Sequence, residues 1–461
     1  MANPSFSTLP LKPALTSNLE SLGFTEMTPV QAQSLPEILE GHDLIGQART
    51  GSGKTAAFGL GLLQFLEEKK FRIQSLVLCP TRELADQVAV EIRRLARNTH
   101  NIKVLTLCGG LPFGPQKGSL EHGAHIIVGT PGRVEEHLRK GNLKLDHLSM
   151  LVLDEADRML DMGFNEVITG IVEKLPEKRQ TLLFSATYPS DIKHLAAEIM
   201  QKPKRITIET SQAESTIRQE LYQIPSGTTR SQILVEILLH KQPTSTLVFC
   251  NTKQLTEEVA DSLIEQGFEA TALHGDFEQR YRESKLLRFA NSSISVLVAT
   301  DVAARGLDID ALDLVVNYHL PRDPEVYTHR IGRTGRAGNI GVACSLYVEG
   351  EENRIVLLEG MGEHKFEYER RPSQVKGRKP QPPLKVTLQL DGGKKQKIRP
   401  GDLLGALTGD KGIAGSQVGK IKIFDQSAFV AVDRDVATQA LNLLQNGKVK
   451  GKSFKARRIK K

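Results

Sequence analysis

The sequence of 461 residues predicts an α/β protein with two tandem parallel-sheet domains and a smaller C-terminal α+β domain. Short β-rich apolar runs alternate with helical stretches through about the first 350 residues, which is the pattern of parallel sheets covered by helices. Two segments about 170 residues apart, SLVLCPTRELADQVAVEI and STLVFCNTKQLTEEVADSL, both have the pattern strand, turn and helix. A chain of this length also exceeds one ordinary core, so we expect several domains.

Changes in composition along the chain predict the domain boundaries. The first domain is expected over 1–208 and the second over 216–365, joined by a linker at 209–215 in the small, polar stretch ETSQAEST. A stretch rich in Lys, Arg, Pro and Gly predicts a second linker at 366–384. The third domain is expected over 385–461.

Positive charge is concentrated toward the C-terminal end. The formal net charge is +7, but residues 376–461 hold 20 Lys and Arg against 6 Asp and Glu, while residues 1–375 hold 41 against 48. Such segregation indicates a nucleic-acid-binding appendage on a mildly acidic body.

The sequence contains no apolar run that approaches the ~20 residues needed to span a bilayer, and its first residues lack the charged and apolar regions of a signal peptide. We therefore expect a cytoplasmic protein without a membrane partner. The cysteines are widely separated and favour buried free thiols over a metal site. They are Cys79, Cys108, Cys250 and Cys344.

The segment ARTGSGKT follows the apolar DLIGQ and precedes a helical stretch. Backbone N–H groups of such a loop bind phosphates, while Lys54 reaches the outer phosphates and Thr55 ligates Mg²⁺. The strict pattern has glycine where Ala48 stands, and the alternative is a glycine-rich turn that happens to precede Lys and Thr. The residues expected at the nucleotide are Ala48, Arg49, Thr50, Gly51, Ser52, Gly53, Lys54 and Thr55.

Two carboxylates follow an apolar run in MLVLDEADRML, as expected where a buried strand ends at the edge of a sheet. Asp154 is positioned to hold magnesium, partly through water, and Glu155 to orient and deprotonate the attacking water. An acidic residue after a strand is often only a helix N-cap. The phosphate loop about 100 residues upstream favours the catalytic interpretation.

The segment HRIGRTGRAG spaces Arg330, Arg333 and Arg336 three apart, which aligns them along one face of a helix or turn. Arginines from a second domain can stabilise charge on a transferring phosphoryl group, so hydrolysis would require domain closure. The alternative is a solvated basic helix face. Three glycines at regular spacing argue against it, because glycine costs a helix roughly 1 kcal/mol each.

Together these residues resemble the DEAD-box ATP-dependent RNA helicases over about 1–365. DEAD itself is Asp154 to Asp157, within the ordered set GFTEMTPVQ, ARTGSGKT, PTREL, GG, TPGR, DEAD, SAT, HGD, ATDVAARGLD and HRIGRTGR. Each motif is weak alone, but the ordered set is very specific. The resemblance implies two RecA-like domains, ATP and Mg²⁺ as cofactors, and RNA rather than DNA as the stable partner.

The resemblance also implies residue roles at the nucleotide. Phe24 would stack on adenine and Gln31 would hydrogen-bond its edge, with Phe6 supporting the same pocket. The other implied roles are a ribose contact for Asp308, arginine fingers for Arg333 and Arg336 beside the catalytic Lys54, Asp154 and Glu155, and coupling to RNA for Ser185 and Thr187.

An RNA track is implied in the same way. Its members are mostly small or polar groups at turns, suited to phosphates and 2′-hydroxyls rather than base edges. For each glycine alone, an ordinary turn after a strand remains an alternative. The track comprises Thr81, Arg82, Gly109, Gly110, Thr130, Pro131, Gly132 and Arg133 in the first domain and Gly275, Asp276, Thr300 and Asp301 in the second.

The third segment has the element order β-α-β-β-α-β of an RNA-recognition motif. Phe429 occupies an expected aromatic position, but Ser427 and Val432 stand where other aromatics are expected, which makes base stacking on the sheet doubtful. Basic side chains are the remaining candidates for RNA contact, on a face that the sequence does not specify. They include Lys420, Lys422, Lys455 and Arg457.

A DEAD-box core with such a module resembles bacterial helicases directed to a structured hairpin of 23S ribosomal RNA. That resemblance implies a non-processive helicase that acts in maturation of the large ribosomal subunit and its precursor particles. Two alternatives stay open: an ATP-gated RNA clamp of broader specificity, which would use the same sites, and a DNA translocase.

Overall fold

The computed structural model describes residues 4–48, 51–208, 217–304, 312–335, 340–360, 365–372, 377–409 and 412–459. The chain divides into two compact units, one with the elements from η1 (Phe6–Thr8) to β7 (Lys204–Thr207) and one with the elements from β8 (Ile217–Gln223) to β18 (Ala456–Arg458). The predictions for the linker 209–215 and for Arg49, Thr50, Asp308 and Arg336 lie outside the described residues.

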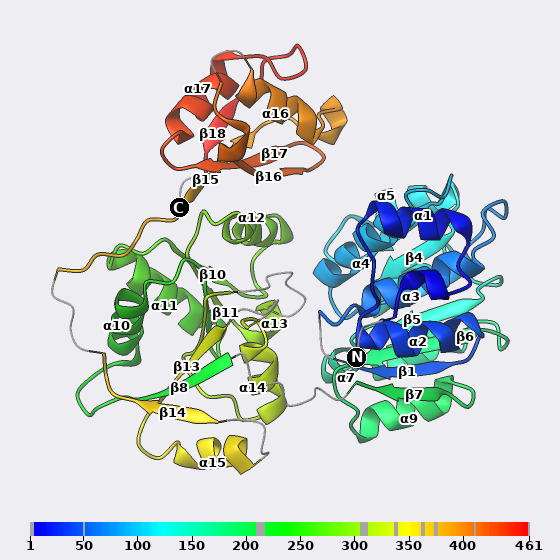
Figure 1. Ribbon diagram of the computed structural model, residues 1–461, viewed down its shortest axis with the longest axis horizontal. Coiled ribbons are helices and arrows are strands. Elements are labelled where there is room, and N and C mark those ends of the chain that lie inside the picture. The colour runs from blue at the N-terminus through cyan, green and yellow to red at the C-terminus, as the bar shows by residue number, and fades with distance from the viewer. Residues whose placement is uncertain are drawn as a thin grey trace. The chain divides into compact units, whose positions relative to one another are not determined.

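The first unit is built on a seven-stranded sheet in the order β3-β4-β2-β5-β6-β1-β7, in which every neighbouring pair is parallel (Figure 1). The five inner strands are short, mostly apolar and almost entirely buried, as parallel strands covered on both faces must be, whereas the edge strands β3 and β7 are partly exposed. Besides β7, the strands of this sheet are β1 (Leu44–Gln47), β2 (Ser75–Leu78), β3 (Val104–Leu107), β4 (Ile126–Gly129), β5 (Met150–Leu153) and β6 (Gln180–Ser185).

Helices cover both faces of this sheet, because successive strand residues point to opposite sides. Val77 and Val152 join the core that contains α2, α3 and α4, whereas Leu76 and Leu151 join the core that contains α6 to α9. The helices are α1 (Pro13–Ser21), α2 (Pro29–Leu39), α3 (Lys54–Phe65), α4 (Arg82–Leu95), α5 (Phe113–Glu121), α6 (Pro131–Arg139), α7 (Ala156–Asp161), α8 (Asn165–Val172) and α9 (Ser190–Ile199).

The second unit repeats this architecture with a parallel sheet in the order β10-β11-β9-β12-β13-β8-β14. Its further strands are β9 (Thr246–Phe249), β10 (Ala270–Leu273), β11 (Val296–Ala299), β12 (Leu314–Asn317), β13 (Gly341–Tyr347) and β14 (Phe366–Glu369). Its helices are α10 (Arg230–Lys241), α11 (Lys253–Glu265), α12 (Gln279–Ala290), α13 (Asp301–Ala304), α14 (Pro324–Ile331) and α15 (Glu352–Gly360).

The second domain extends beyond the predicted boundary at 365. Phe366–Glu369 forms β14, which pairs with β8 in parallel, so the linker expected over 366–384 begins too early. Arg218 on β8 bonds to Glu367 and Glu369 on β14, and these ion pairs support an edge strand that looks too polar to be a strand. The apolar pattern that identified the other strands is missing here.

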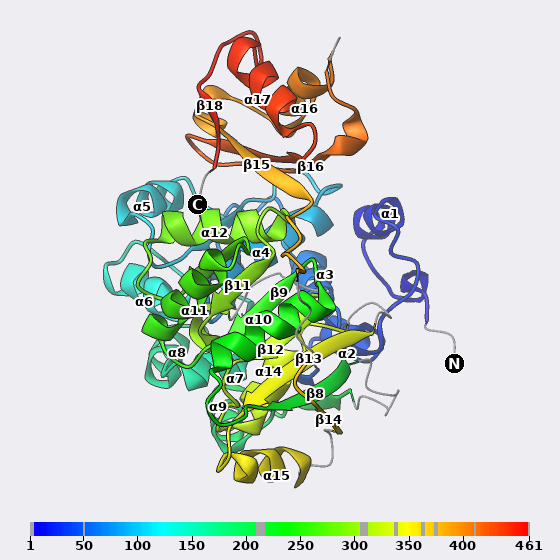
Figure 2. The same cartoon turned by 90° about the vertical axis from the view of Figure 1, so that its left-hand side faces the viewer.

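The C-terminal domain is an antiparallel sheet in the order β16-β17-β15-β18 with two helices on one face, as Figure 2 shows. The predicted β-α-β-β-α-β order is therefore correct. Leu388 and Val430 from the sheet share one core with Leu403 and Leu444 from the helices. The elements are β15 (Lys385–Leu390), η2 (Lys394–Gln396), α16 (Pro400–Thr408), η3 (Gly415–Gln417), β16 (Val418–Ile423), β17 (Ala428–Asp433), α17 (Ala437–Asn446) and β18.

The structure also bears on the predicted buried thiols and on the predicted absence of membrane-spanning segments. All four cysteines are buried and free, which confirms that interpretation. Within the described ranges, the helices are all too short or too polar to cross a bilayer.

Candidate nucleotide site and nucleic-acid track

The strand order of the first sheet sorts its motifs into two groups. Parallel strands end at the same edge of a sheet, and ligands of such sheets bind there. The neighbours β5, β6 and β1 are followed by DEAD, SAT and the phosphate loop, whereas the neighbours β3, β4 and β2 are followed by GG, TPGR and PTREL. The nucleotide motifs and the nucleic-acid motifs therefore lie side by side along one edge.

The phosphate loop has the backbone that its sequence predicts. Gly51 and Gly53 have φ angles of 82° and 97°, in the left-handed region that favours glycine. The helix α3 begins at Lys54, whose side chain is buried and whose Nζ donates to the carbonyl oxygen of Ala48 at 2.9 Å. Thr55 follows in the first turn of α3, so both side chains sit where the pattern requires them.

Gln31 connects the first turn of α2 to this loop. Its side-chain Oε1 accepts from the backbone N–H of Thr28 at 2.9 Å, and its Nε2 donates to the carbonyl oxygen of Gly53 at 3.1 Å. A Cβ at Gly53 would lie 2.5 Å from Gln31 Nε2, so this close approach requires glycine. The expected adenine reader is thus bonded directly to the phosphate loop.

The aromatic residues expected at adenine contact each other. Phe6 and Phe24 meet edge to face with their ring centroids 6.1 Å apart, and Phe6 is buried while Phe24 is partly exposed. The guanidinium of Arg94, from α4, lies 5.3 Å from the centroid of the Phe24 ring. Phe6 therefore packs against Phe24, and a role of these rings at adenine stays a prediction.

Asp154 has the surroundings of a magnesium ligand. The carboxyl is buried, and its Oδ1 has no hydrogen-bond partner among the described residues. Burial raises the pKa of Asp154 to about 6, against the opposing charge of Lys54. A divalent cation would satisfy the unpaired oxygen and stabilise the ionised carboxylate. The residues present therefore fit Mg²⁺, with Asp154 and Thr55 as the groups that would hold it.

Glu155 occupies a constrained position next to this carboxylate. Its φ angle is 54°, a left-handed conformation that is unfavourable for a residue with a side chain. The side chain is buried, and Oε2 accepts from NH1 of Arg158 at 2.8 Å. Arg158, which the sequence did not single out, thus orients the expected general base.

Asp157 is a second residue of this site to which the sequence analysis gave no role. Its Oδ2 accepts from the backbone N–H groups of Ala186 and Thr187 and from Thr187 Oγ1, at 3.0 to 3.1 Å. Ser185 is buried, and its carbonyl oxygen accepts from the N–H of Ala48 in the phosphate loop at 3.0 Å. The SAT segment, Ser185 to Thr187, is therefore bonded both to Asp157 of DEAD and to Ala48 of the phosphate loop.

The expected RNA residues of the first domain lie at helix starts and turns. Thr81 caps α4, since its Oγ1 accepts from Leu84 N–H at 3.3 Å, and Arg82 follows it. Gly109 and Gly110 are exposed, and no atom would meet a Cβ within 4 Å at either position.

The GG and TPGR motifs are bonded to each other. Thr130 Oγ1 accepts from Gly109 N–H at 3.4 Å, and Arg133 donates to the carbonyl oxygen of Leu111 at 3.0 Å. Pro131 is buried at the start of α6, while Gly132 is exposed. The structure thus brings the two motifs to one surface.

In the second domain, Gly275 and Asp276 follow β10 and are exposed. The carboxylate of Asp276 pairs with Lys253 at the start of α11, and this hydrogen bond lowers its pKa. Lys253 therefore lies beside the expected RNA residues and adds a positive charge that the sequence analysis did not assign.

Asp301 is bonded to the first arginine of the HRIGR motif. Both of its carboxylate oxygens accept from Arg330, at 2.6 and 2.8 Å, while Thr300 Oγ1 accepts from Ala303 N–H. Arg330 is almost fully buried and also donates to Asn317 Oδ1 and to the carbonyl oxygen of His319. Arg330 therefore links α14 to Asp301, which follows the end of β11.

The arginines spaced three apart do not share one helix. Arg330 lies in α14, which ends at Ile331, and Arg333 lies in the turn beyond and is buried. An arginine-finger role therefore remains a prediction for Arg333.

The basic candidates of the C-terminal domain are exposed. Lys422 lies opposite Phe429 on β17, and Phe424 contacts Phe429 edge to face at 5.4 Å. Arg457 pairs with Asp391 at 2.7 Å. Lys420 lies on β16, whereas Lys455 precedes β18, which is shorter than the sequence predicted.

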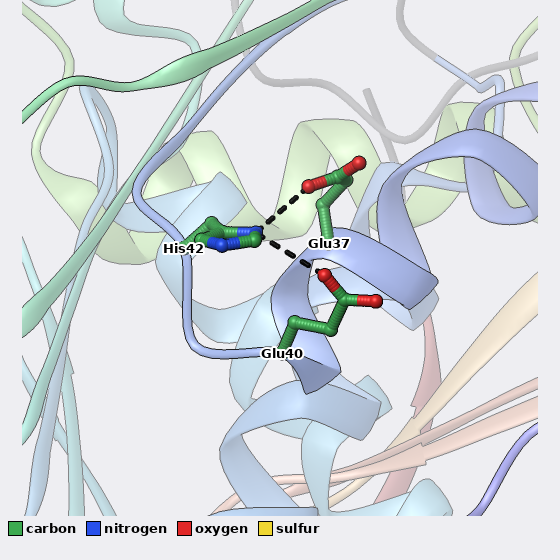
Figure 3. Close-up of side chains that lie close together, drawn as sticks. All are labelled: Glu37, Glu40 and His42. Carbon is green, nitrogen blue, oxygen red and sulfur yellow. Dashed lines mark hydrogen bonds and ion pairs between the residues drawn. The ribbon is translucent and has the colours of Figure 1, made fainter.

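One further group of possible metal ligands lies at the end of α2 (Figure 3). His42 Nδ1 is 2.8 Å from Glu37 Oε2 and 3.5 Å from Glu40 Oε2. These side chains are partly or fully exposed, and their mutual ion pairs account for the arrangement, so we assign no ion to them.

Comparisons with known proteins agree with this geometry. The family models that match are the DEAD/DEAH box helicase over 28–195, the helicase conserved C-terminal domain over 229–338 and the DbpA RNA binding domain over 387–458. The ATP-dependent RNA helicase DbpA of Escherichia coli is 52% identical over 99% of this chain and 100% of its own length. That of Bacillus subtilis is 38% identical over 96% of this chain and 97% of its own.

Among solved structures, Saccharomyces cerevisiae Dbp5 bound to RNA and ADP BeF3 matches with a TM-score of 0.73 and 30% identity, over 80% of this chain and 96% of that one. The full-length matches include the C-terminal module as well as both helicase domains. The chain therefore belongs to the DEAD-box ATP-dependent RNA helicases, in the group that carries a DbpA RNA-binding domain.

Proposed function

We propose that this helicase remodels 23S ribosomal RNA during assembly of the large ribosomal subunit, with its C-terminal domain binding a structured hairpin of that RNA. The observation that carries the proposal is the match of residues 387–458 to the DbpA RNA binding domain, in the part of the chain where positive charge is concentrated. Precursor particles of the large subunit are the proposed partners, and the cytoplasm is the proposed location.

At the nucleotide, we propose one role for each residue, and the bonds of Gln31 and Lys54 to the phosphate loop support these roles. Gln31 and Phe24 hold adenine, and Lys54 binds the outer phosphates. Bound ATP with Mg²⁺ supplies the phosphoryl group that water attacks, and Glu155 accepts the proton of that water as the bond to the β-phosphate breaks. Arg333 and Arg336 supply positive charge to the transferring group, and Asp308 contacts the ribose.

Coupling to RNA is proposed to run through Asp157. Its carboxylate accepts from the N–H groups of Ala186 and Thr187, and the carbonyl oxygen of the preceding Ser185 accepts from the N–H of Ala48 in the phosphate loop. A change at the phosphates therefore has a short bonded route toward the neighbouring RNA motifs. The RNA track itself offers turns and small side chains, so the helicase core is expected to be indifferent to base sequence.

The test compares the full-length protein with a variant lacking residues 376–461 over a panel of RNAs. We expect 23S rRNA fragments to stimulate ATP hydrolysis by the full-length protein more than unrelated RNAs do. The truncated protein should keep basal hydrolysis and lose this preference. Equal stimulation of the full-length protein by all RNAs would contradict the proposed targeting.

Two further measurements separate the alternative functions. Release of a short duplex strand that depends on ATP is expected of a helicase, whereas ATP-dependent retention without release would favour an RNA clamp. Stimulation by DNA equal to that by RNA would favour a DNA translocase instead.

A further inference from the structure

Three loops of the C-terminal domain gather at one end of its sheet. They are 391–399 between β15 and α16, 424–427 between β16 and β17, and 447–455 between α17 and β18, and we call them the loop end. Lys394 N–H donates to the carbonyl oxygen of Phe424 at 2.8 Å, and Lys395 N–H to that of Asp425 at 2.9 Å. These two bonds join the first loop to the second.

The third loop is joined to the first in the same way. Asp391 N–H donates to the carbonyl oxygen of Lys455 at 2.9 Å, and Lys450 Nζ donates to that of Lys397 at 2.6 Å. A Cβ at Gly392 would lie 2.6 Å from the ring of Phe454, which packs against the core. The three loops are therefore held together by hydrogen bonds and form one continuous surface.

This surface is strongly basic. Its three loops contain eight Lys and Arg residues against two Asp, and all eight cations are exposed. One of the acids, Asp391, is paired with Arg457. The eight cations are Lys394, Lys395, Lys397, Arg399, Lys448, Lys450, Lys452 and Lys455.

Two of these lysines occupy backbone positions that favour glycine. Lys397 has a φ angle of 59° and Lys450 a φ angle of 52°. The left-handed conformation costs a residue with a side chain about 1 kcal/mol or more, a cost that glycine avoids. The Lys450 side chain is used within the loop end, through its bond to the carbonyl oxygen of Lys397, whereas Lys397 is exposed.

The open face of the sheet offers much less to RNA. Phe429 is buried, and its neighbour Phe424 meets it edge on. On this face Lys385 is paired with Asp433 and Arg457 with Asp391, while Lys420 and Lys422 on β16 are exposed. Stacking of unpaired bases needs exposed aromatic faces, and this sheet provides little aromatic surface for it.

We propose that the loop end is the surface through which the C-terminal domain holds RNA, by contacts to the phosphates of a folded RNA. This proposal rests on the proposed function and names the part of the domain that performs it. Lysine is a flexible point charge that binds phosphate without reading bases, so its ligand is a phosphate-rich backbone. A folded RNA presents phosphates of several strands at once, which suits cations carried on three loops.

The experiment uses full-length protein and two matched double variants, each of which removes two lysine charges. Lys395→Gln with Lys452→Gln changes the loop end, and Lys420→Gln with Lys422→Gln changes the open face. The probe is a hairpin-containing 23S rRNA fragment, titrated at several salt concentrations. We expect the loop-end variant to bind about tenfold more weakly and its salt slope to fall by about two, because each phosphate contact contributes about one unit.

The open-face variant removes two of the cations that the sequence predicted at RNA. Because the proposal places the phosphate contacts on the loop end instead, this variant is expected to bind within about twofold of the unchanged protein. An equal or larger loss in that variant would overturn the proposal. Binding of a polyglutamate of equal charge with the affinity of the RNA would identify an acidic polymer rather than RNA as the partner, and would overturn it too.

The two proposals fail in different ways. If the full-length protein binds an unrelated hairpin of equal length as tightly as the 23S rRNA fragment, the proposed targeting fails. The comparison of loop-end and open-face variants still applies, since it can be made on any folded RNA. If the 23S rRNA preference holds while the loop-end variant binds normally, only the loop-end proposal fails.

Discussion

The side-chain amide nitrogen of Gln31 lies 3.1 Å from the carbonyl oxygen of Gly53, and this bond joins the start of α2 to the phosphate loop. The same amide group accepts from Thr28 N–H, so Gln31 is fixed at both ends of its amide. The proposed recognition of adenine and the shape of the loop are therefore linked through one side chain.

Replacement of Gln31 by glutamate should raise the KM for ATP about tenfold. Glutamate keeps the acceptor for Thr28 but loses the donor to Gly53, and one lost bond to a partly buried carbonyl is worth about 1 kcal/mol or slightly more. Steady-state ATPase kinetics measure this change. Gln33→Glu, on the same helix, is the control, and an unchanged KM in the Gln31 variant would contradict the adenine role.

Replacement of Glu155 by glutamine should reduce kcat for ATP hydrolysis by about 100-fold or more, because a general base contributes that much. ATP and RNA should still bind, so the variant should hold both together in a pull-down with RNA. The exposed Glu166→Gln on α8 serves as the control for the charge change. Normal turnover in Glu155→Gln would remove this residue from the base role.

Asp157→Asn should separate ATP hydrolysis from strand separation. Asp157 Oδ2 accepts three hydrogen bonds from Ala186 and Thr187. An amide nitrogen in its place is itself a donor and cannot accept these bonds. We expect duplex unwinding to fall at least about tenfold more than basal hydrolysis does, since about 1.4 kcal/mol of coupling corresponds to that factor. Asp146→Asn, which is exposed, should leave both activities unchanged.

Arg330→Lys should lower the stability of the second domain. A lysine cannot reproduce the two-pronged bond to Asp301 together with the bonds to Asn317 and His319. Since Asp301 is partly exposed, we expect a loss of about 2 kcal/mol, below the usual 3–5 for a buried pair. Thermal unfolding followed by circular dichroism measures it, with the more exposed Arg354→Lys as a control expected to cost less than about 1 kcal/mol.

His319 predicts a loss of stability in mild acid. Burial, with the charge of Arg230, lowers the pKa of His319 to about 4, while the unfolded chain keeps the ordinary value of 6.5. Between these values the unfolded state binds the proton, so the free energy of unfolding falls as pH falls from 6.5 toward 4. Thermal midpoints at pH 7 and pH 5 should differ less in His319→Asn than in the unchanged protein, and an equal difference in both would contradict this prediction.

The parallel sheets and the C-terminal element order were predictable because their signal is local. Runs such as MLVL and TLVF are buried on both faces, so they are apolar throughout, and β5 and β9 lie where these runs predict. The edge strand β14 gives no such signal, because Glu367 and Glu369 are held by Arg218, which is distant in sequence. Pairing between distant segments decides that strand, and one sequence does not display it.

The same limit applies to the candidate site. Lys54, Asp154 and Glu155 could be singled out as candidates because their motifs are contiguous, whereas Arg330 and Asp301 belong to different motifs and their bond appears only in the fold. Asp157 could have been found as the remaining acid of DEAD. Its partners, however, lie about 30 residues downstream and depend on β5 and β6 being neighbours.

Lys54 already has a hydrogen-bond partner within its own loop, the carbonyl oxygen of Ala48. The ammonium carries three N–H donors, so an arriving nucleotide can bond to the two others and can also exchange Ala48 for a phosphate oxygen at this one. The gain from this exchange is the difference between a charged phosphate oxygen and a neutral carbonyl, which grows with the charge on the phosphates. We therefore expect the loop to favour nucleotides with a longer and more highly charged phosphate chain, because a singly phosphorylated nucleotide gains least from displacing Ala48.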